Sequence, residues 1–211
     1  HFEQGLYPTL TPLAFDPGHP FPHISNLSLN LAVVLDDPEH GERFARVKIP
    51  DIFPRLLRIP VEPPVMGEPS VLSVDTPGPA QFVWVEDVIA ANLDRLFVGM
   101  QIVGSHLFRV TRDADVEIEE DEAADLLTTI EERVGLRHFG SVIRLEVESS
   151  MPDRVRDILT TNLGLQPYLV YAVNSPMGMV SLWELMKLDA PNLKDRPFVA
   201  AAPPVLSTEP D

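Results

Sequence analysis

The sequence predicts an α+β fold in which a mixed β-sheet and three to four helices packed against it form a single domain. Segments with the period-two alternation of strands fill the first half of the chain without helices between them, and strands alternate with helices only in the second half. The chain has 211 residues, of which 45% are hydrophobic, so it can bury an ordinary core without metal or disulfide support.

The first half of the chain predicts short strands separated by proline-rich segments. Residues 7–22 contain five prolines and are expected to form a stiff, extended lead-in, because each proline fixes φ and removes a donor. Leucine and valine alternate with other residues over 27–35, which predicts a half-buried strand. Two further short strands are expected at 44–49 and 55–59. Residues 61–80 also contain five prolines, which predicts a surface excursion rather than a packed element.

The middle of the chain predicts two strand–helix pairs. Residues 81–85 form a predicted strand that leads into a helix ended by Gly99, whose apolar face contains Val88, Ile89, Leu93, Leu96 and Phe97. Another strand is expected at 102–111. A helix is expected at 121–137, with acids at its N-terminal end, where the helix dipole favours them.

The last third predicts two more strands and two short helices. Residues 142–148 alternate apolar with charged side chains, as in a strand with one solvent-facing side. Residues 150–153 and 181–184 resemble capping boxes, which predicts helices ending near Gly164 and residue 188. A strand is expected between these helices at 168–173.

Composition limits the classes of function. The chain has no cysteine, which excludes disulfides, thiolate metal sites and cysteine nucleophiles and fits a reducing cytoplasm. Its formal net charge of −16 repels polyanions, so no nucleic-acid partner is expected. The longest apolar stretch, 27–35, is too short to span a membrane, and secretion is not expected. A start at His1 and a loose, proline-containing end predict an internal piece of a longer polypeptide.

One acidic run has the spacing of a calcium loop. Asp113, Asp115 and Glu117 match its first, third and fifth positions. However, Ile118 and Ala124 stand where the loop needs glycine and glutamate. The run is therefore interpreted as a solvated, acidic start of a helix.

The histidines and glycines provide no complete catalytic motif. His19 and His23 flank prolines and could meet in space, but a structural role is expected for every histidine in the chain: His1, His19, His23, His40, His106 and His138. Gly99 and Gly104 have the spacing of a phosphate loop, yet Ser105 follows where lysine is required. We predict no catalytic residue, metal site or cofactor site in this chain.

One basic cluster runs against the overall charge. Residues 43–58 contain Asp51 as their single acid, together with five basic residues: Arg43, Arg46, Lys48, Arg55 and Arg58. Arg46 and Lys48 are expected on one face of a strand, with Arg58 beside them on a neighbouring strand. Two interpretations stay open. The cluster either consists of solubilising edge charges or forms a strip that contacts phosphate, which the net charge permits because exposed charges beyond about 8–10 Å are screened.

Several ordered motifs resemble one family, the middle or head domain of bacterial polyphosphate kinase. The similarity spans nearly the whole chain and is carried by Tyr7–Ala14, Asp16–Pro22, Ile24–Val33, Arg43–Pro50, Glu86–Phe97, Phe108–Asp115 and Asp189–Phe198. Only the proline-rich segment 61–80 is longer than the resemblance leads us to expect.

The resemblance implies an enzyme part. The parent enzyme would transfer the terminal phosphate of ATP to polyphosphate through a phosphohistidine in domains absent from this chain, with ATP and Mg²⁺ also bound there. Residues 1–198 would form the head domain and 199–211 a linker toward the C-terminal catalytic domains. The isolated domain is expected to be inactive.

The resemblance also implies partners and a location. The partners would be the remaining domains, a second copy of the chain and polyphosphate, in a cytoplasmic enzyme whose parent associates with membranes in some cases. The residues expected along the polyphosphate path are Arg43, Arg46, Lys48, Arg58, Arg109 and Arg112. The alternative is a purely structural dimerisation module without substrate contact.

Overall fold

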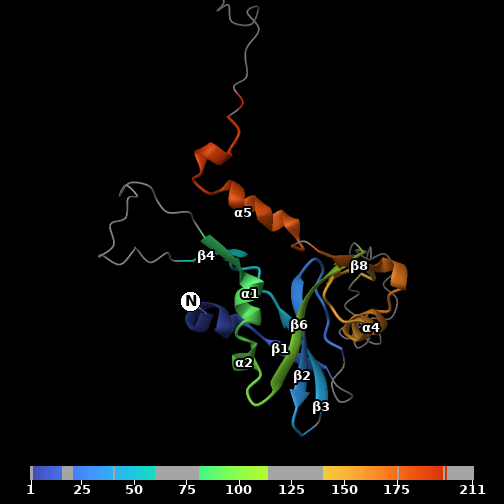
Figure 1. Cartoon of the computed structure of the whole chain (residues 1–211). Coiled ribbons are helices and arrows are strands. Elements are labelled where there is room, and N and C mark those ends of the chain that lie inside the picture. Colours follow the sequence, from blue (N-terminus) through green and yellow to red (C-terminus); the bar gives the residue numbers. More distant parts are fainter. Residues whose placement is uncertain are drawn as a thin grey trace, which may run out of the picture. The chain divides into compact units, whose positions relative to one another are not determined.

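The computed structural model describes residues 2–15, 21–39, 41–59, 81–113, 140–174 and 176–196, together with Phe198. The chain divides into two compact units, His1–Met179 and Val180–Asp211. The first unit holds a six-stranded sheet in the order β1-β3-β2-β6-β7-β8 and a two-stranded sheet of β4 and β5 (Figure 1). The predicted α+β class with a mixed sheet is confirmed.

The large sheet consists mainly of antiparallel pairs. Among the described strands, only β7 and β8 run parallel, as expected for strands joined through a helix. The predicted strands of the large sheet are confirmed, and a strand that was not predicted, β1, pairs with β3 at the edge. The strands are β1 (Pro12–Phe15), β2 (Leu29–Asp37), β3 (Gly41–Lys48), β6 (Gln101–Arg112), β7 (Val142–Glu148) and β8 (Val170–Val173).

Strand β2 is buried on both faces. Leu31, Val33 and Leu35 face one hydrophobic core, which we call the first core. Ala32 and Val34 face a separate core on the other side of the sheet, the second core. The prediction of a half-buried strand is therefore wrong, because the small residues between the leucines are covered as well.

Two short helices cover the first core. They are α1 (Val85–Ala90) and α2 (Leu93–Leu96), and their buried residues include Ile89 and Leu93. The sequence predicted one continuous helix, but a turn at residues 91–92 divides it. The chain leaves this region through Gly99, whose φ of 83° is readily adopted only by glycine.

The N-terminal segment also packs on the first core. It begins with the helical turns η1 (Phe2–Leu6) and η2 (Tyr7–Thr9), so the prediction of an extended lead-in is wrong over 7–9. Leu6 and Leu10 are buried there. Pro12 then begins β1, an edge strand where its missing donor is tolerated.

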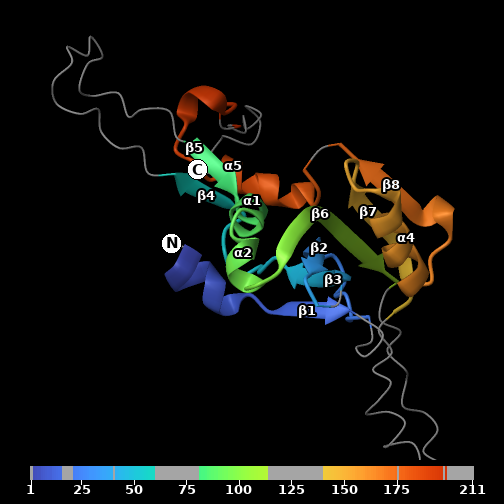
Figure 2. The ribbon, with the colours of Figure 1, turned by 60° about the horizontal axis from the view of Figure 1, so that its bottom comes forward.

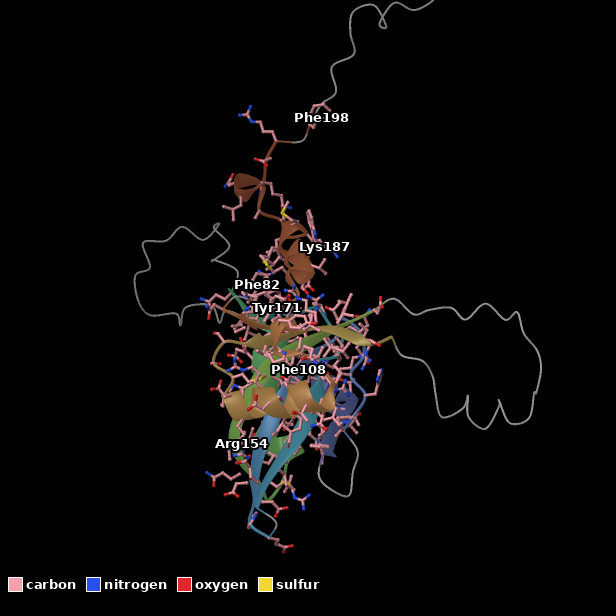
Figure 3. The ribbon with its side chains drawn as sticks, turned by 90° about the vertical axis from the view of Figure 1, so that its right-hand side faces the viewer. Phe82, Phe108, Arg154, Tyr171, Lys187 and Phe198 are labelled. Carbon is pink, nitrogen blue, oxygen red and sulfur yellow. The ribbon has the colours of Figure 1, made fainter. Side chains whose placement is uncertain are left out.

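Helix α4 (Asp153–Asn162) and the segment 21–26 cover the second core. Val155 and Leu159 of α4 pack with the fully buried Phe108 of β6, which lies behind α4 in Figure 3. In Figure 2, α4 lies on the side of β6 opposite to α1 and α2. The predicted capping box at 150–153 is wrong, because Pro152 is the N-cap and makes no side-chain hydrogen bond.

The remaining elements of the first unit are a hairpin and a turn. Strands β4 (Leu56–Ile59) and β5 (Gln81–Trp84) pair antiparallel and confirm two predicted strands. The turn η3 (Pro167–Leu169) leads into β8. The predictions for 61–80 and 121–137 lie outside the described residues.

The second unit contains short helical segments. These are most of η4 (Met179–Leu182), then α5 (Trp183–Met186) and η5 (Pro191–Leu193). A helix was predicted here, but its capping box is wrong, since the N-cap of α5 is Leu182 without a side-chain bond. No helix within the described part of the chain is long and apolar enough to cross a membrane.

Candidate functional site

The structure separates the six predicted path residues into three places. Arg46 and Lys48 share the β3 face of Phe44, which belongs to the second core, and Arg112 lies near the same core. Strand alternation places Arg43 and Arg109 on the first-core face of the sheet. Arg58 lies on β4, which pairs with β5 in the separate hairpin, so its predicted place beside Arg46 is wrong.

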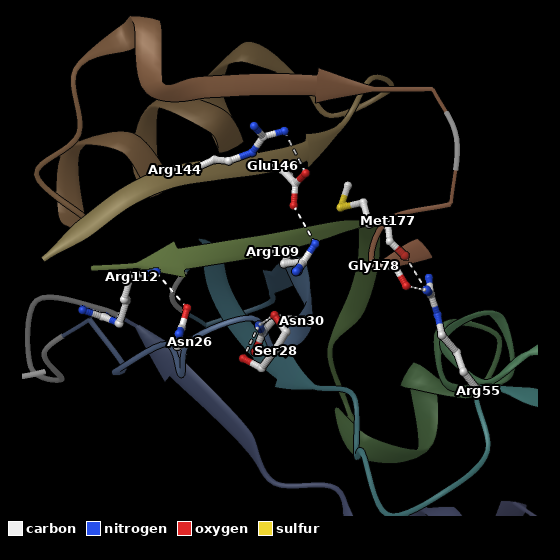
Figure 4. A network of polar contacts seen from close by, with 10 residues as sticks. All are labelled: Asn26, Ser28, Asn30, Arg55, Arg109, Arg112, Arg144, Glu146, Met177 and Gly178. Carbon is white, nitrogen blue, oxygen red and sulfur yellow. Dashed lines mark hydrogen bonds and ion pairs between the residues drawn. The ribbon is translucent and has the colours of Figure 1, made fainter. Parts of the chain in front are cut away.

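The arginines on the first-core face are paired with acids. Arg43 Nε lies 3.0 Å from Asp37 Oδ2. Arg109 Nη1 and Arg144 Nη2 lie 3.1 Å and 3.0 Å from the two oxygens of Glu146 (Figure 4). These pairings neutralise much of the charge that a bound anion would otherwise meet.

Arg46 is buried beside a neutral partner. Arg46 is only 6% exposed, and its Nε donates to Asn30 Oδ1 at 2.7 Å. Asn30 is itself fully buried and donates through Nδ2 to the Ser28 carbonyl at 2.8 Å (Figure 4). No described carboxylate pairs with Arg46, and burial lowers the pKa of its guanidinium.

Arg112 also has neutral partners only, among the residues described. Its Nε donates to the Ile24 carbonyl and its Nη1 to the Gly140 carbonyl, both at 2.8 Å. Its Nη2 lies 3.4 Å from His23 Nδ1. These three contacts use three of the five N–H groups of the guanidinium, and burial lowers its pKa. The backbone amide of Arg112 donates to Asn26 Oδ1 (Figure 4).

His23 stands at the rim of this group. Burial, Arg112 and Arg46, in that order, lower the pKa of its imidazole from 6.5. Since a guanidinium only donates, Nδ1 accepts from Arg112, and Nε2 carries the proton of the neutral ring. The sequence predicts a structural role for His23; His19, which was expected to be able to meet it, lies outside the described residues.

The side chains of Arg112 and His23, but not that of Arg46, adjoin a cavity of about 390 Å³. Arg112 and His23 line it, and no acidic residue does among those described; the full lining is Phe21, Pro22, His23, Arg112, Ser141, Val142, Asn162, Leu163 and Gly164. We call this cavity, with Arg46 nearby, the basic pocket.

The end of α4 at this pocket is internally satisfied. Three backbone amides that follow the last residue of α4 donate to carbonyls of its final turn: Leu163 N to Leu159 O, Gly164 N to Thr161 O and Leu165 N to Thr160 O. Gly164 makes this possible with a φ of 67°. The helix therefore directs few free carbonyls toward the pocket, and the local charge is set by the arginines.

Acidic residues gather around a different cavity of about 350 Å³, on the first-core side. Glu86, Asp87 and Glu148 line it, and burial, Glu86 and Glu148 raise the pKa of Asp87. Arg55 donates to Glu86. It also donates to the carbonyls of Met177 and Gly178 (Figure 4). Within the described ranges, no three histidine or carboxylate side chains are arranged to hold a metal ion.

Comparison with known proteins places the chain in one family. The family model described as polyphosphate kinase middle domain matches residues 1–185. Polyphosphate kinase 1 of Chlorobaculum tepidum is 50% identical over 199 residues, which are 94% of this chain and 27% of that protein. A polyphosphate kinase of Synechocystis is 47% identical over 212 residues, covering 97% of this chain and 28% of its own length.

A solved structure has the same fold. The crystal structure of polyphosphate kinase from Porphyromonas gingivalis matches with a TM-score of 0.63 at 22% identity, covering 96% of this chain and 26% of that one. The chain thus spans about a quarter of the length of these relatives. With the family model covering most of the sequence, the chain belongs to the polyphosphate kinase middle-domain family.

Proposed function

We propose that this chain is the head domain of a polyphosphate kinase and forms part of the path along which polyphosphate moves. The parent enzyme transfers the terminal phosphate of ATP to a growing polyphosphate chain, and the transfer occurs on other domains. Membership of the family and names of the relatives support this proposal, as does the fraction of the relatives' length that the chain spans.

The single observation that supports a polyphosphate path through this chain is the basic pocket. In a chain of net charge −16, the partners of Arg46 and Arg112 among the described residues are neutral groups. Lys48 lies on the same face as Arg46. Arg43 and Arg109, which are paired with acids, and Arg58, on the hairpin, contribute less to this path.

The residues described here do not fit an ATP or Mg²⁺ site. Gly104 lies inside strand β6 rather than in a phosphate loop. The described carboxylates do not form a metal-binding group. As the resemblance to the family implies, we propose that the phosphohistidine, ATP and Mg²⁺ belong to other domains of the parent enzyme.

The proposal includes partners and a location. The head domain would contact the remaining domains of its own polypeptide and a second copy, in a cytoplasmic enzyme. The alternative, a structural module without substrate contact, is favoured by one observation. Tyr171 of the edge strand β8 and Tyr168 of the turn η3 before it are 42% and 76% exposed, as on a surface that another protein covers.

The test of catalytic silence compares this chain with the full-length polypeptide. Both are incubated with ATP, Mg²⁺ and polyphosphate, and the release of ADP is measured. We expect turnover from the full-length protein only. Turnover by the 211-residue chain above a buffer control would contradict the proposal.

A further inference from the structure

We infer that residues 179–196, which we call the apolar segment, form an interaction surface that is covered by an apolar groove on another part of the same polypeptide, outside these 211 residues. The inference rests on the proposed function in one respect, because that function supplies the longer parent polypeptide. It adds a surface and the partner that covers it, and it is independent of the basic pocket.

The apolar segment exposes several large apolar side chains close together. It contains η4, α5 and η5, and no side chain of residues 180–196 is buried. Trp183 is 68% exposed and Leu193 is 88% exposed. The other large apolar side chains exposed in the segment are Met179, Val180, Leu185 and Met186. Single exposed apolar residues are normal on a protein surface, but a group of them marks a surface that another structure covers.

The helices of the segment are too short to be stable by themselves. The α-helix α5 spans 4 residues and the adjoining 3₁₀ helix η4 also spans 4. Isolated helices of this length are not stable in water, and most helical stability in proteins comes from the packing of an apolar face. Because no buried side chain of residues 180–196 supplies this packing, the segment needs a surface outside itself.

The residues just before the segment are fixed within the first unit. Nη1 of Arg55 donates to the carbonyl of Met177 and, at 3.1 Å, to the carbonyl of Gly178. Arg55 is only 5% exposed, and Glu86 holds its guanidinium from the other side. Since the start of the segment is already held, less conformational freedom is lost when the segment docks.

The charges of the segment favour a neutral protein partner. Its formal net charge is zero in a chain of net charge −16, because three acids are balanced by three bases: Glu184, Asp189 and Asp195 with Lys187, Lys194 and Arg196. A helix that binds an anionic membrane has an excess of lysine and arginine on its polar face. Tryptophan and methionine, both exposed here, are enriched at protein–protein interfaces.

The relatives indicate which protein supplies the groove. The family model of the middle domain ends at residue 185, inside the apolar segment. The match to the Synechocystis protein covers 97% of this chain, which includes the segment, but only 28% of that protein. The segment therefore adjoins the boundary of the middle domain in polypeptides that consist mostly of other parts. A covalently linked part is present at high effective concentration, so we assign the groove to it.

The test is hydrogen exchange, measured by mass spectrometry, of peptides from residues 179–196 in the 211-residue chain and in the full-length polypeptide. We expect exchange in these peptides to be slower by roughly tenfold or more in the full-length polypeptide. Trp183→Ser should remove most of this protection and leave exchange in the 211-residue chain unchanged. Ile52→Ser is the matched control, because Ile52 is an apolar residue that is 71% exposed outside the segment.

A photo-crosslinker identifies the partner. With p-benzoylphenylalanine in place of Trp183, we expect the full-length polypeptide to form crosslinks from the segment to its own residues outside the 211-residue chain, at the mass of one copy. Crosslinked protein of doubled mass would assign the surface to a second copy and overturn the inference. Protection of the segment in the 211-residue chain by vesicles of phosphatidylcholine and phosphatidylglycerol would assign it to a membrane, with the same consequence.

Two further results would overturn the inference. One is equally fast exchange of residues 179–196 in the two proteins. The other is an equal loss of protection in Ile52→Ser and Trp183→Ser, which would indicate a general loosening of the fold. Neither result touches the proposed function, which fails separately if the isolated chain turns over ATP.

Discussion

The buried guanidinium of Arg46 donates from Nε to Oδ1 of Asn30 at 2.7 Å, and no carboxylate of the described chain accompanies this pair. The contact joins the adjacent strands β2 and β3 on their second-core face. A folding domain gains little from a buried charge in this setting, because desolvation of the ion is compensated only by a neutral amide.

The first prediction is that Arg46→Gln does not destabilise the chain. Glutamine places an amide nitrogen at the same bond separation as Nε, so the bond to Asn30 is retained while the charge is lost. We expect the free energy of unfolding, measured with urea, to stay the same or to rise by about 1 kcal/mol. A loss of more than about 2 kcal/mol would show that the charge stabilises the fold.

The second prediction concerns Arg55, which, unlike Arg46, is buried together with a carboxylate partner. Arg55 and Glu86 are buried together, with Nε of Arg55 3.0 Å from Glu86 Oε1. Arg55→Met leaves the carboxylate buried without its partner and should lower the free energy of unfolding by about 3–5 kcal/mol. Arg95→Gln, which breaks an exposed pair, should change it by less than about 1 kcal/mol. Similar urea midpoints for the two variants would refute this contrast.

The third prediction is a loss of stability in mild acid. The pKa values of His23 and His106 are lowered from 6.5 in the folded chain, in both cases chiefly by burial. The unfolded chain therefore binds more protons than the folded chain below about 6.5. Stability is complete above that value and decreases as the pH falls through the lowered folded values.

The variant that checks this is His106→Gln. Its unfolding free energy should decrease less than that of the wild-type chain between about pH 7.5 and 5.5, because one titrating group is removed. An identical dependence on pH in both proteins would mean that His106 does not contribute to the acid sensitivity.

The fourth prediction tests the second core. Leu159 of α4 is fully buried there, and Leu159→Ala should cost about 2–5 kcal/mol through lost burial and a remaining cavity. Thr161 is exposed on the same helix, and Thr161→Ala should stay within about 0.5 kcal/mol of the wild-type chain. Equal effects would place α4 away from the core.

The fold was predictable where the hydrophobic period was strong. The alternation along β2 and β7 located both strands. It did not reveal that β2 is buried on both faces. Asn30, Ala32 and Val34 are small or polar residues of the kind found on a solvent-facing side of a strand, and only the packing of the second core shows that they are buried. The division of the helix near Ala91 likewise depends on packing rather than on the pattern of apolar residues.

The site was predictable only within one strand. The shared face of Arg46 and Lys48 follows from strand geometry alone. The contact between Arg112 and His23 joins residues 89 positions apart in the sequence, and no local signal announces it. Arg109 and Arg112 lie three positions apart in β6, so strand alternation alone places them on opposite faces of the sheet.

The most direct test of the proposed function is the kinetics of the full-length polypeptide carrying Arg46→Gln or Arg112→Lys, with Arg95→Gln as control. If the proposed polyphosphate path is correct, we expect KM for polyphosphate to rise by about threefold to tenfold in the first two variants, with kcat within about twofold of wild type, because these residues would bind polyphosphate and would not perform the transfer. A KM that stays the same in both variants, or a collapse of kcat at unchanged KM, would contradict it.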